Sequence, residues 1–162
     1  MSDNGELLKD ACDQVIHDPM LAPEKDALGH VVTTHCNEGA LLVAQAMGCL
    51  EFDTPEGAEP MLADAEIYFM IENASGRWRL VSGSAATIHA LGGGLAFAAM
   101  TSSELGEKHG HIAAIYPVGM GFSQSLRRDV PYCANIGTCQ KEELVSMAFP
   151  VSKGEPQYYV YD

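Results

Sequence analysis

Basic residues are scarce in this sequence. Only 9 Lys and Arg stand against 22 Asp and Glu in 162 residues, so the formal net charge is -13. Such a chain is repelled by polyanions, and it lacks the phosphate neutralisation that supplies most nucleic-acid affinity. We therefore expect no nucleic-acid partner and no binding to an anionic membrane surface.

Long hydrophobic runs are also missing. The longest apolar stretches, residues 40–50 and 90–100, are eleven residues each and are interrupted by Gln or Gly, whereas a membrane-spanning helix needs about 20 residues. The first twenty residues carry five acidic side chains and no apolar stretch, which argues against a Sec-type signal peptide. The sequence thus predicts no membrane span and synthesis in the cytoplasm without a Sec signal.

The cysteines show none of the close pairs that mark redox or zinc motifs. There are five of them, and no two form a CxxC pair. Because five is odd, a full set of disulfides would leave one thiol over. At least one cysteine therefore needs another explanation, and the pairing of the rest stays open: Cys12, Cys49, Cys133 and Cys139.

The composition is otherwise that of an ordinary globular protein, with 47% hydrophobic residues, and residues 1–162 suit a single domain with its own core. Apolar periodicity predicts helices over 4–20, 40–47, 61–72 and 84–91, with Cys36 in the first turn of the second and Thr34 as its N-cap. Apolar runs between Gly, Pro and polar turns predict strands over 95–100, 111–116, 131–136, 145–149 and 157–161. The expected class is α+β, with N-terminal helices packed on a C-terminal antiparallel sheet.

Cys36 is the best candidate nucleophile in the chain. At a helix N-terminus, unpaired backbone N–H groups and the helix dipole favour the thiolate, which lowers the pKa of a thiol from its usual value of about 8.5. The alternative is a buried structural cysteine, which is the commoner role of a thiol beside an apolar helix.

A thiol nucleophile needs a general base, and the sequence offers six histidines. His111 opens an apolar strand directly after Gly110, so its ring can project from the strand end toward a helix terminus. His109 shares that strand face by the two-residue period but falls in the preceding loop. His35 neighbours Cys36 and is aimed differently by the tight turn. We interpret the remaining three as ordinary surface or core residues: His17, His30 and His89.

Asn135 is the candidate for the third member of the site. A Cys-His site uses a group that accepts the second ring N–H of the histidine and so orients the imidazole, and an Asn can fill that role. Asn135 is a polar residue in an otherwise apolar strand, 24 positions after His111. The alternative is that it pairs with a neighbouring turn.

A metal site is the competing interpretation of the same region. Its ligands would be His109, His111, Cys133 and Cys139. An HxH pair combined with Cys-x5-Cys is not a usual zinc spacing, so we do not favour this interpretation.

Three short motifs carry a family resemblance. They are Thr34-His35-Cys36-Asn37 opening a helix, His109-Gly110-His111-Ile112-Ala113 opening a strand, and Ala134-Asn135-Ile136-Gly137. Together, and in the order Cys, His, polar residue, they resemble the NlpC/P60 and CHAP superfamily of papain-like cysteine peptidases. The similarity extends from about Thr33 to Tyr161. It looks closest to the compact bacterial peptidoglycan amidases, which include phage lysins and amidase effectors of type VI secretion.

The resemblance implies a papain-like NlpC/P60 fold and an activity. A cysteine amidopeptidase of this family hydrolyses an amide in the peptide stem or cross-link of bacterial peptidoglycan through an acyl-enzyme, here on Cys36. His111 would take the thiol proton and return it to the leaving amine, while Asn135 holds the ring. The Cys36 backbone N–H would meet the oxyanion, with His35, Asn37 and His109 as further oxyanion or substrate-binding candidates. Neither a metal nor another cofactor is needed.

The resemblance also implies partners and a place of action. The partners would be a peptidoglycan peptide and, for an effector, an inhibitory or immunity protein. Action would take place at the cell wall, in the periplasm or outside the cell, after export or lysis. Two alternatives stay open, namely a thiol acyltransferase of the same fold and a catalytically silent domain that binds wall peptides or a protein.

Overall fold

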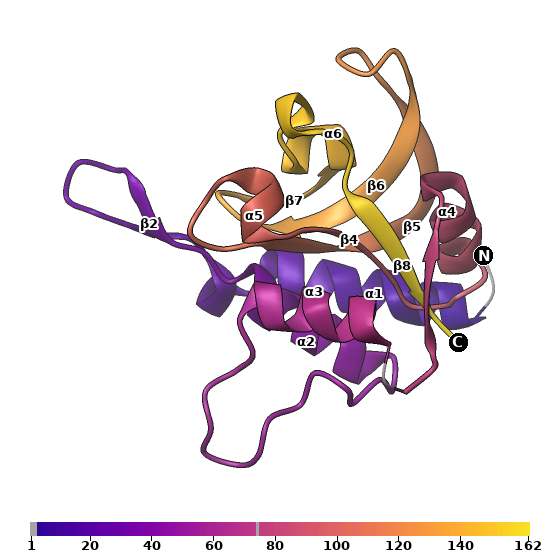
Figure 1. Cartoon of the computed structure of the whole chain (residues 1–162), viewed down its shortest axis with the longest axis horizontal. Coiled ribbons are helices and arrows are strands. Elements are labelled where there is room, and N and C mark those ends of the chain that lie inside the picture. The colour runs from indigo at the N-terminus through magenta and orange to yellow at the C-terminus, as the bar shows by residue number, and fades with distance from the viewer. Residues whose placement is uncertain (1–2, 74) are drawn as a thin grey trace.

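The computed structural model of the protein describes residues 3–73 and 75–162. Its centre is a six-stranded antiparallel sheet in the order β3-β8-β4-β5-β6-β7. The strands are Trp78–Val81 (β3), Ala96–Met100 (β4), His111–Ser123 (β5), Arg128–Ile136 (β6), Gln140–Leu144 (β7) and Gln157–Tyr161 (β8). A small separate hairpin, Glu24–Lys25 (β1) with Val31–Thr33 (β2), projects from the body (Figure 1).

Helices cover the sheet. Three of them, Asp3–His17 (α1), Cys36–Ala46 (α2) and Ala63–Glu72 (α3), lie together on one side, and the short helix Val145–Ala148 (α6) lies on the other (Figure 1). Gly83–Leu91 (α4) packs against β5, and Ser102–Leu105 (α5) follows β4. Two 3-10 turns span Pro19–Leu21 and Val151–Lys153. The α+β class with an antiparallel sheet is confirmed, although β3 and β4 are interleaved with the helices.

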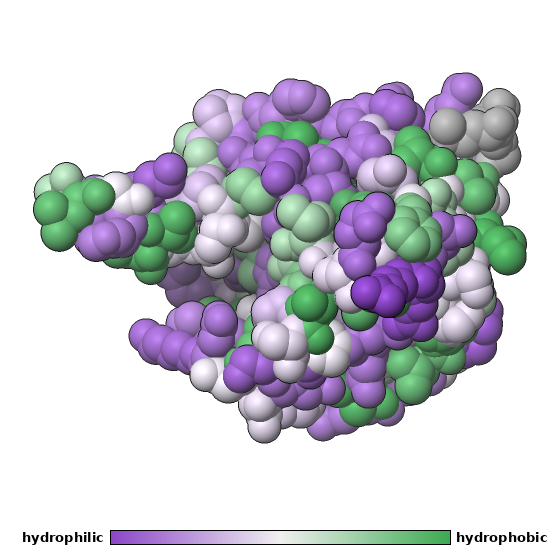
Figure 2. Space-filling model, turned by 90° about the horizontal axis from the view of Figure 1, so that it is seen from above, coloured by the Kyte–Doolittle hydropathy of each residue, from purple (hydrophilic) through white to green (hydrophobic). Residues whose placement is uncertain are grey.

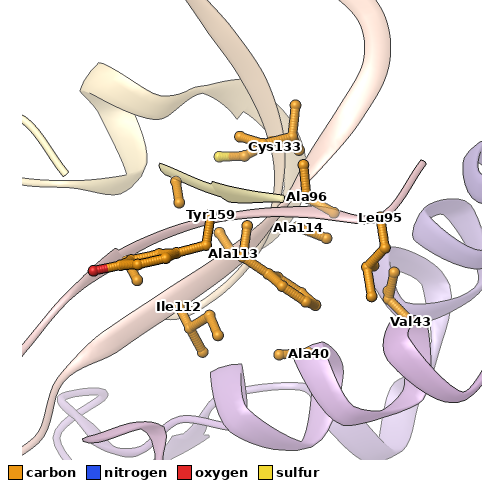
Figure 3. Packing of buried hydrophobic residues seen from close by; sticks show 14 of the residues in the cluster. Ala40, Val43, Leu95, Ala96, Ile112, Ala113, Ala114, Cys133 and Tyr159 are labelled. Carbon is orange, nitrogen blue, oxygen red and sulfur yellow. The ribbon is translucent and has the colours of Figure 1, made fainter. Parts of the chain in front are cut away.

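The helix that begins at Cys36 is fixed on the sheet by close packing. Gly39 of α2 lies against Ile136 of β6, and a Cβ atom on Gly39 would come within 2.8 Å of Ile136 Cγ1. Ala40 and Val43 point from α2 toward the sheet, where Ile112 of β5 lies on the side of Ala40 and Leu95 lies beside Val43 (Figure 3). Full burial of such an aliphatic side chain stabilises the fold by about 1.5–3 kcal/mol. The small residues of α2 therefore hold its N-terminus close to the start of β5.

The first helix ends earlier than the sequence predicts. Leu8, Cys12 and Val15 of α1 are buried at helical spacing, but the helix ends at His17 because Pro19 has no N–H to continue the helical hydrogen bonds. The chain instead makes the 3-10 turn, in which the Asp18 carboxylate accepts a hydrogen bond from the Met20 N–H at 2.9 Å.

Two local expectations are wrong. The segment 145–149 is not a strand, because Val145 and Phe149 are both buried four residues apart and the Phe149 N–H donates to the Val145 carbonyl at 2.9 Å, as in a helical turn. The residue at the N-cap of α2 is His35 and not Thr34, and its side chain makes no capping hydrogen bond. Strands β3 and β7 were not expected, and β5 continues past Pro117 to Ser123.

Within the described ranges 3–73 and 75–162, no helix combines the length and the apolar character that crossing a membrane would require.

Candidate active site

The Cys36 sulfur lies against the backbone that carries His111. It is buried, with 5% of the residue exposed, and lies 4.0 Å from the carbonyl oxygen of Gly110. The backbone N–H of Ile112 points at the same sulfur. The thiol therefore touches the residues on both sides of His111.

The position of this backbone follows from two local features. Asp64 of α3 holds the chain before β5, because its carboxylate accepts hydrogen bonds from the Gly110 N–H at 2.9 Å and the Ser102 N–H at 2.8 Å. Gly110 leaves no room for a side chain, since a Cβ would meet the Met100 carbonyl oxygen at 2.9 Å.

His111 is the first residue of β5, and its ring is joined to Asn135. The distance between His111 Nε2 and Asn135 Oδ1 is 3.0 Å. The ring also packs against Phe149, with 4.8 Å between the ring centroids. Burial lowers the pKa of His111 to about 4, although the Asn135 hydrogen bond and the charge of Glu143 favour the protonated ring. At neutral pH the imidazole is uncharged.

Asn135 is held from its other side by residues that the sequence did not single out. Its Nδ2 donates to Glu143 Oε1 at 2.6 Å and lies 3.6 Å from the Cys139 sulfur. Glu143 belongs to β7, and its other oxygen pairs with Lys141 Nζ at 2.9 Å. The pattern Gln140–Leu144 consists mostly of charged residues, so nothing in the sequence marks it as a strand beside Asn135. The position of Glu143 near Asn135 becomes apparent only from the register between β6 and β7.

The thiol does not have the low pKa that its helix position predicts. Burial raises the pKa of Cys36 to about 11. The backbone N–H groups of Ile112, Asn37 and Cys36 lower it, as expected at a helix N-terminus, but the desolvation is larger and Glu66 also raises it. The resting site therefore holds a protonated thiol and a neutral imidazole.

Glu66 is a second buried ionisable group near this thiol. The residue is 1% exposed, and its Oε2 is buried without a hydrogen-bond partner in the described part of the chain. Burial raises its pKa from the usual 4.5 to about 9, so the carboxyl group is protonated at neutral pH.

The three further candidates differ in how far their side chains are engaged. His35 Nδ1 lies 3.1 Å from Glu38 Oε1. The Asn37 side chain donates one of its two amide N–H groups to the Met61 carbonyl at 2.7 Å, which fixes the segment before α3. His109 lies in the loop before β5, as the sequence predicts, and contributes to both hollows described next.

Two neighbouring hollows meet at the candidate site. The larger, of about 660 Å³, lies between β2, the start of α2 and the segment before α3, and Cys36 is on its wall. The smaller, of about 410 Å³, contains His111, Asn135 and Glu143. In Figure 2 the hairpin stands away from the body, and the surface is hollowed beside its base. The residues common to both hollows are Thr34, Lys108, His109, Gly110 and Thr138.

The structure brings the three predicted catalytic residues to one end of β5, but it joins only two of them directly. The hydrogen bonds among residues 3–73 and 75–162 include His111 to Asn135 and none between the Cys36 sulfur and the His111 ring. Such contacts are often long in a substrate-free site and tighten when substrate binds.

The metal-site interpretation has no support in the described residues. Cys133 is fully buried in β6, and among the residues the structure describes no three His, Cys, Asp or Glu side chains gather in a way that could hold a metal ion. The five cysteines carry free thiols.

A comparison with models of known protein families gives no match for this chain, and a comparison with curated proteins gives none either.

Proposed function

We propose that this protein is a cysteine amidopeptidase that hydrolyses an amide bond in the peptide part of bacterial peptidoglycan. The observation that carries the proposal is the hydrogen bond between His111 and Asn135 at the strand end whose backbone touches the Cys36 sulfur. Thiol acyl chemistry needs a thiol nucleophile and a histidine oriented by an acceptor. Here an amide oxygen orients the histidine, and the thiol contacts the backbone on both sides of that residue.

The proposed reaction has two stages. The Cys36 sulfur forms a bond to the amide carbonyl carbon while His111 takes the thiol proton, so that a protonated thiol does not have to ionise first. The C–N bond then breaks, and His111 returns the proton to the leaving amine. Water, activated by the same ring, hydrolyses the thioester and restores the thiol. Asn135 holds the imidazole throughout.

The Cys36 backbone N–H is the proposed donor to the oxyanion. It lies at the N-terminus of α2, where N–H groups have no partner within the helix and the helix dipole favours negative charge. The candidates for the second oxyanion donor are His35, Asn37 and His109. Asn37 Nδ2 donates one N–H to the Met61 carbonyl and has a second N–H.

The larger hollow supports a peptide as the substrate. Its walls combine apolar side chains, such as Val32 and Leu62, with the acidic Glu38 and Glu59 and the basic Lys108. A stem peptide carries both carboxylates and amino groups next to short apolar side chains. The resemblance to wall amidases favours the peptide of peptidoglycan as the substrate. The proposed place of action is then the cell wall, and an effector of this kind would have an immunity protein as a partner.

The proposal is tested by digesting purified peptidoglycan and identifying the products by mass spectrometry. We expect new amine and carboxylate ends with the wild-type protein and none with Cys36→Ala, because the substitution removes the nucleophile. Cys49→Ala is the matched control, since Cys49 is also a buried thiol but lies outside the site. Its activity should stay within about tenfold of the wild type.

Two other results would replace the proposal. An acyl group transferred to an added amine, with no hydrolysis, would identify an acyltransferase. Binding of wall fragments that is unchanged in Cys36→Ala, with no cleavage by either protein, would identify a catalytically silent binding domain.

A further inference from the structure

Glu143 lies behind the proposed catalytic residues and closes a chain of hydrogen bonds. The chain runs from His111 Nε2 to Asn135 Oδ1 at 3.0 Å, and from Asn135 Nδ2 to Glu143 Oε1 at 2.6 Å. Glu143 sits opposite Cys133 in the β6–β7 register and on the same sheet face as Asn135. The carboxylate does not reach the imidazole through any hydrogen bond of its own in the described residues.

The chemistry of these groups fixes the direction of every bond in the chain. An ionised carboxylate can only accept hydrogen bonds, whereas an amide has one accepting end and one donating end. Glu143 Oε2 forms an ion pair with Lys141 Nζ at 2.9 Å, and the Glu143 side chain is only 9% exposed. Glu143 must therefore face the NH2 of Asn135, and this turns the amide oxygen toward His111.

We infer that Glu143 is a positioning residue that sets the tautomer of His111. Because Asn135 presents an oxygen, the ring nitrogen that faces it must be the one that carries the hydrogen. His111 is therefore protonated on Nε2 and has its lone pair on Nδ1. The inference rests on the proposed function in one respect, namely that Nδ1 is then the nitrogen that accepts the Cys36 proton.

The surroundings of the ring make this tautomer well defined. The pKa of His111 is lowered to about 4, so the ring is neutral at pH 7. A neutral imidazole has one N–H, which is either on Nδ1 or on Nε2. The groups that face Asn135 and Glu143 from β7 and the turn before it are Cys139 and Lys141. The Cys139 sulfur lies 3.7 Å from Glu143 Oε1 and 3.6 Å from Asn135 Nδ2, so it joins the same network.

The test is the 15N NMR spectrum of the histidine rings at neutral pH. The His111 signals are assigned by their absence in His111→Gln. We expect the wild-type protein to show a protonated Nε2 and an unprotonated Nδ1. In Glu143→Gln the new amide can accept from Asn135 or donate to it, so the Asn135 amide can turn either way. A measurable fraction of the His111 rings should then change tautomer.

Activity gives the second measurement. If only rings with a free Nδ1 are competent, kcat for Glu143→Gln should fall by the same factor as the Nε2–H population measured in the spectrum, and KM should change little. Glu142→Gln is the matched control, because Glu142 is the adjacent and exposed residue of β7 and loses the same charge. Its spectrum and kcat should equal those of the wild type.

The outcomes separate this inference from the proposed function. A wild-type His111 protonated on Nδ1 overturns the inference without any mutant, and so does a folded Glu143→Gln protein whose His111 tautomer is unchanged. If the spectra agree with expectation while neither protein cleaves peptidoglycan, the positioning role of Glu143 stands and the proposed reaction does not.

Discussion

Gly137 and His111 approach each other so closely that the glycine hydrogen is required. A Cβ on Gly137 would lie 3.0 Å from His111 Cε1 and 2.9 Å from Asn135 Oδ1, which is tighter than van der Waals contact. The absence of a side chain at Gly137 therefore allows the His111 imidazole to reach the Asn135 amide.

Gly137→Ala is expected to separate His111 from Asn135. The added methyl group must push the ring or the amide aside, and a displacement of this kind near reacting groups lowers kcat by about tenfold or more. The strain should also lower the free energy of unfolding, by about 1–3 kcal/mol. Kinetics on wall fragments and a denaturant titration measure the two effects. A kcat equal to that of the wild type would show that the contact has no part in catalysis.

His111 and not His109 is expected to be the base. His111→Ala should lower kcat/KM by about 10²-fold or more, the typical loss when a general acid–base group is removed. His109→Ala should have a much smaller effect, because His109 precedes β5 and only lines the hollows. Rates for the two purified and folded variants decide between them, and the opposite ranking would move the site to His109.

Alkylation of Cys36 is expected to be slow at neutral pH and to accelerate as the pH rises. The pKa of the thiol is about 11, so the reactive thiolate fraction should increase about tenfold for each pH unit below that value. Mass spectrometry of the Cys36 peptide after iodoacetamide treatment gives the rate, and Cys36→Ser identifies the signal. Rapid labelling at pH 7 would contradict the dominance of burial over the helix N-terminus.

Glu66 is expected to make the fold less stable as the pH rises. Its pKa is about 9 in the folded protein and about 4.5 in the unfolded chain, so both states are protonated below pH 4.5. Between pH 4.5 and 9 only the unfolded state gains by ionising. This group alone therefore lowers the free energy of unfolding by up to about 1.4 kcal/mol per pH unit in that window.

Glu66→Gln tests this dependence, because the amide keeps the shape and cannot ionise. Relative to the wild type, the variant should unfold at higher denaturant at pH 8 and show a much smaller difference at pH 5. Glu72→Gln, on the exposed end of the same helix, serves as the control for a lost surface charge. If the difference in denaturant midpoint between Glu66→Gln and the wild type does not change with pH, the Glu66 carboxyl group is already ionised in the folded protein.

Much of the architecture is readable from local pattern. The predicted strand 157–161 agrees with β8 at both ends, and the predicted helix 84–91 is α4 with one residue more. Both segments carry their signal within themselves. Residues 157–161 are rich in aromatic and β-branched residues, and residues 84–91 are mostly small or apolar and end at a glycine turn. The start of a helix at Cys36 followed in the same way from the apolar run that comes after it.

The site was less predictable, because its properties depend on contacts between distant segments. The helix N-terminus is visible in the sequence, but the burial that raises the pKa of Cys36 comes from β5, more than seventy residues later. The sequence does not predict a role for Glu143, because β7 is a charged edge strand without an apolar face. A residue such as this acquires its role only from the register with its neighbour.

The place of β8 in the sheet has a consequence for biosynthesis. This strand, near the end of the sequence, lies between β3 and β4, with Tyr159 opposite both Leu80 and Phe97. While the ribosome is still making residues 157–161, β3 and β4 each lack the partner between them, and their ladder groups remain open to other chains. The sheet therefore closes only after residues 157–161 have been made, and a chain that stops before them exposes two unpaired edges that chaperones and proteases can engage.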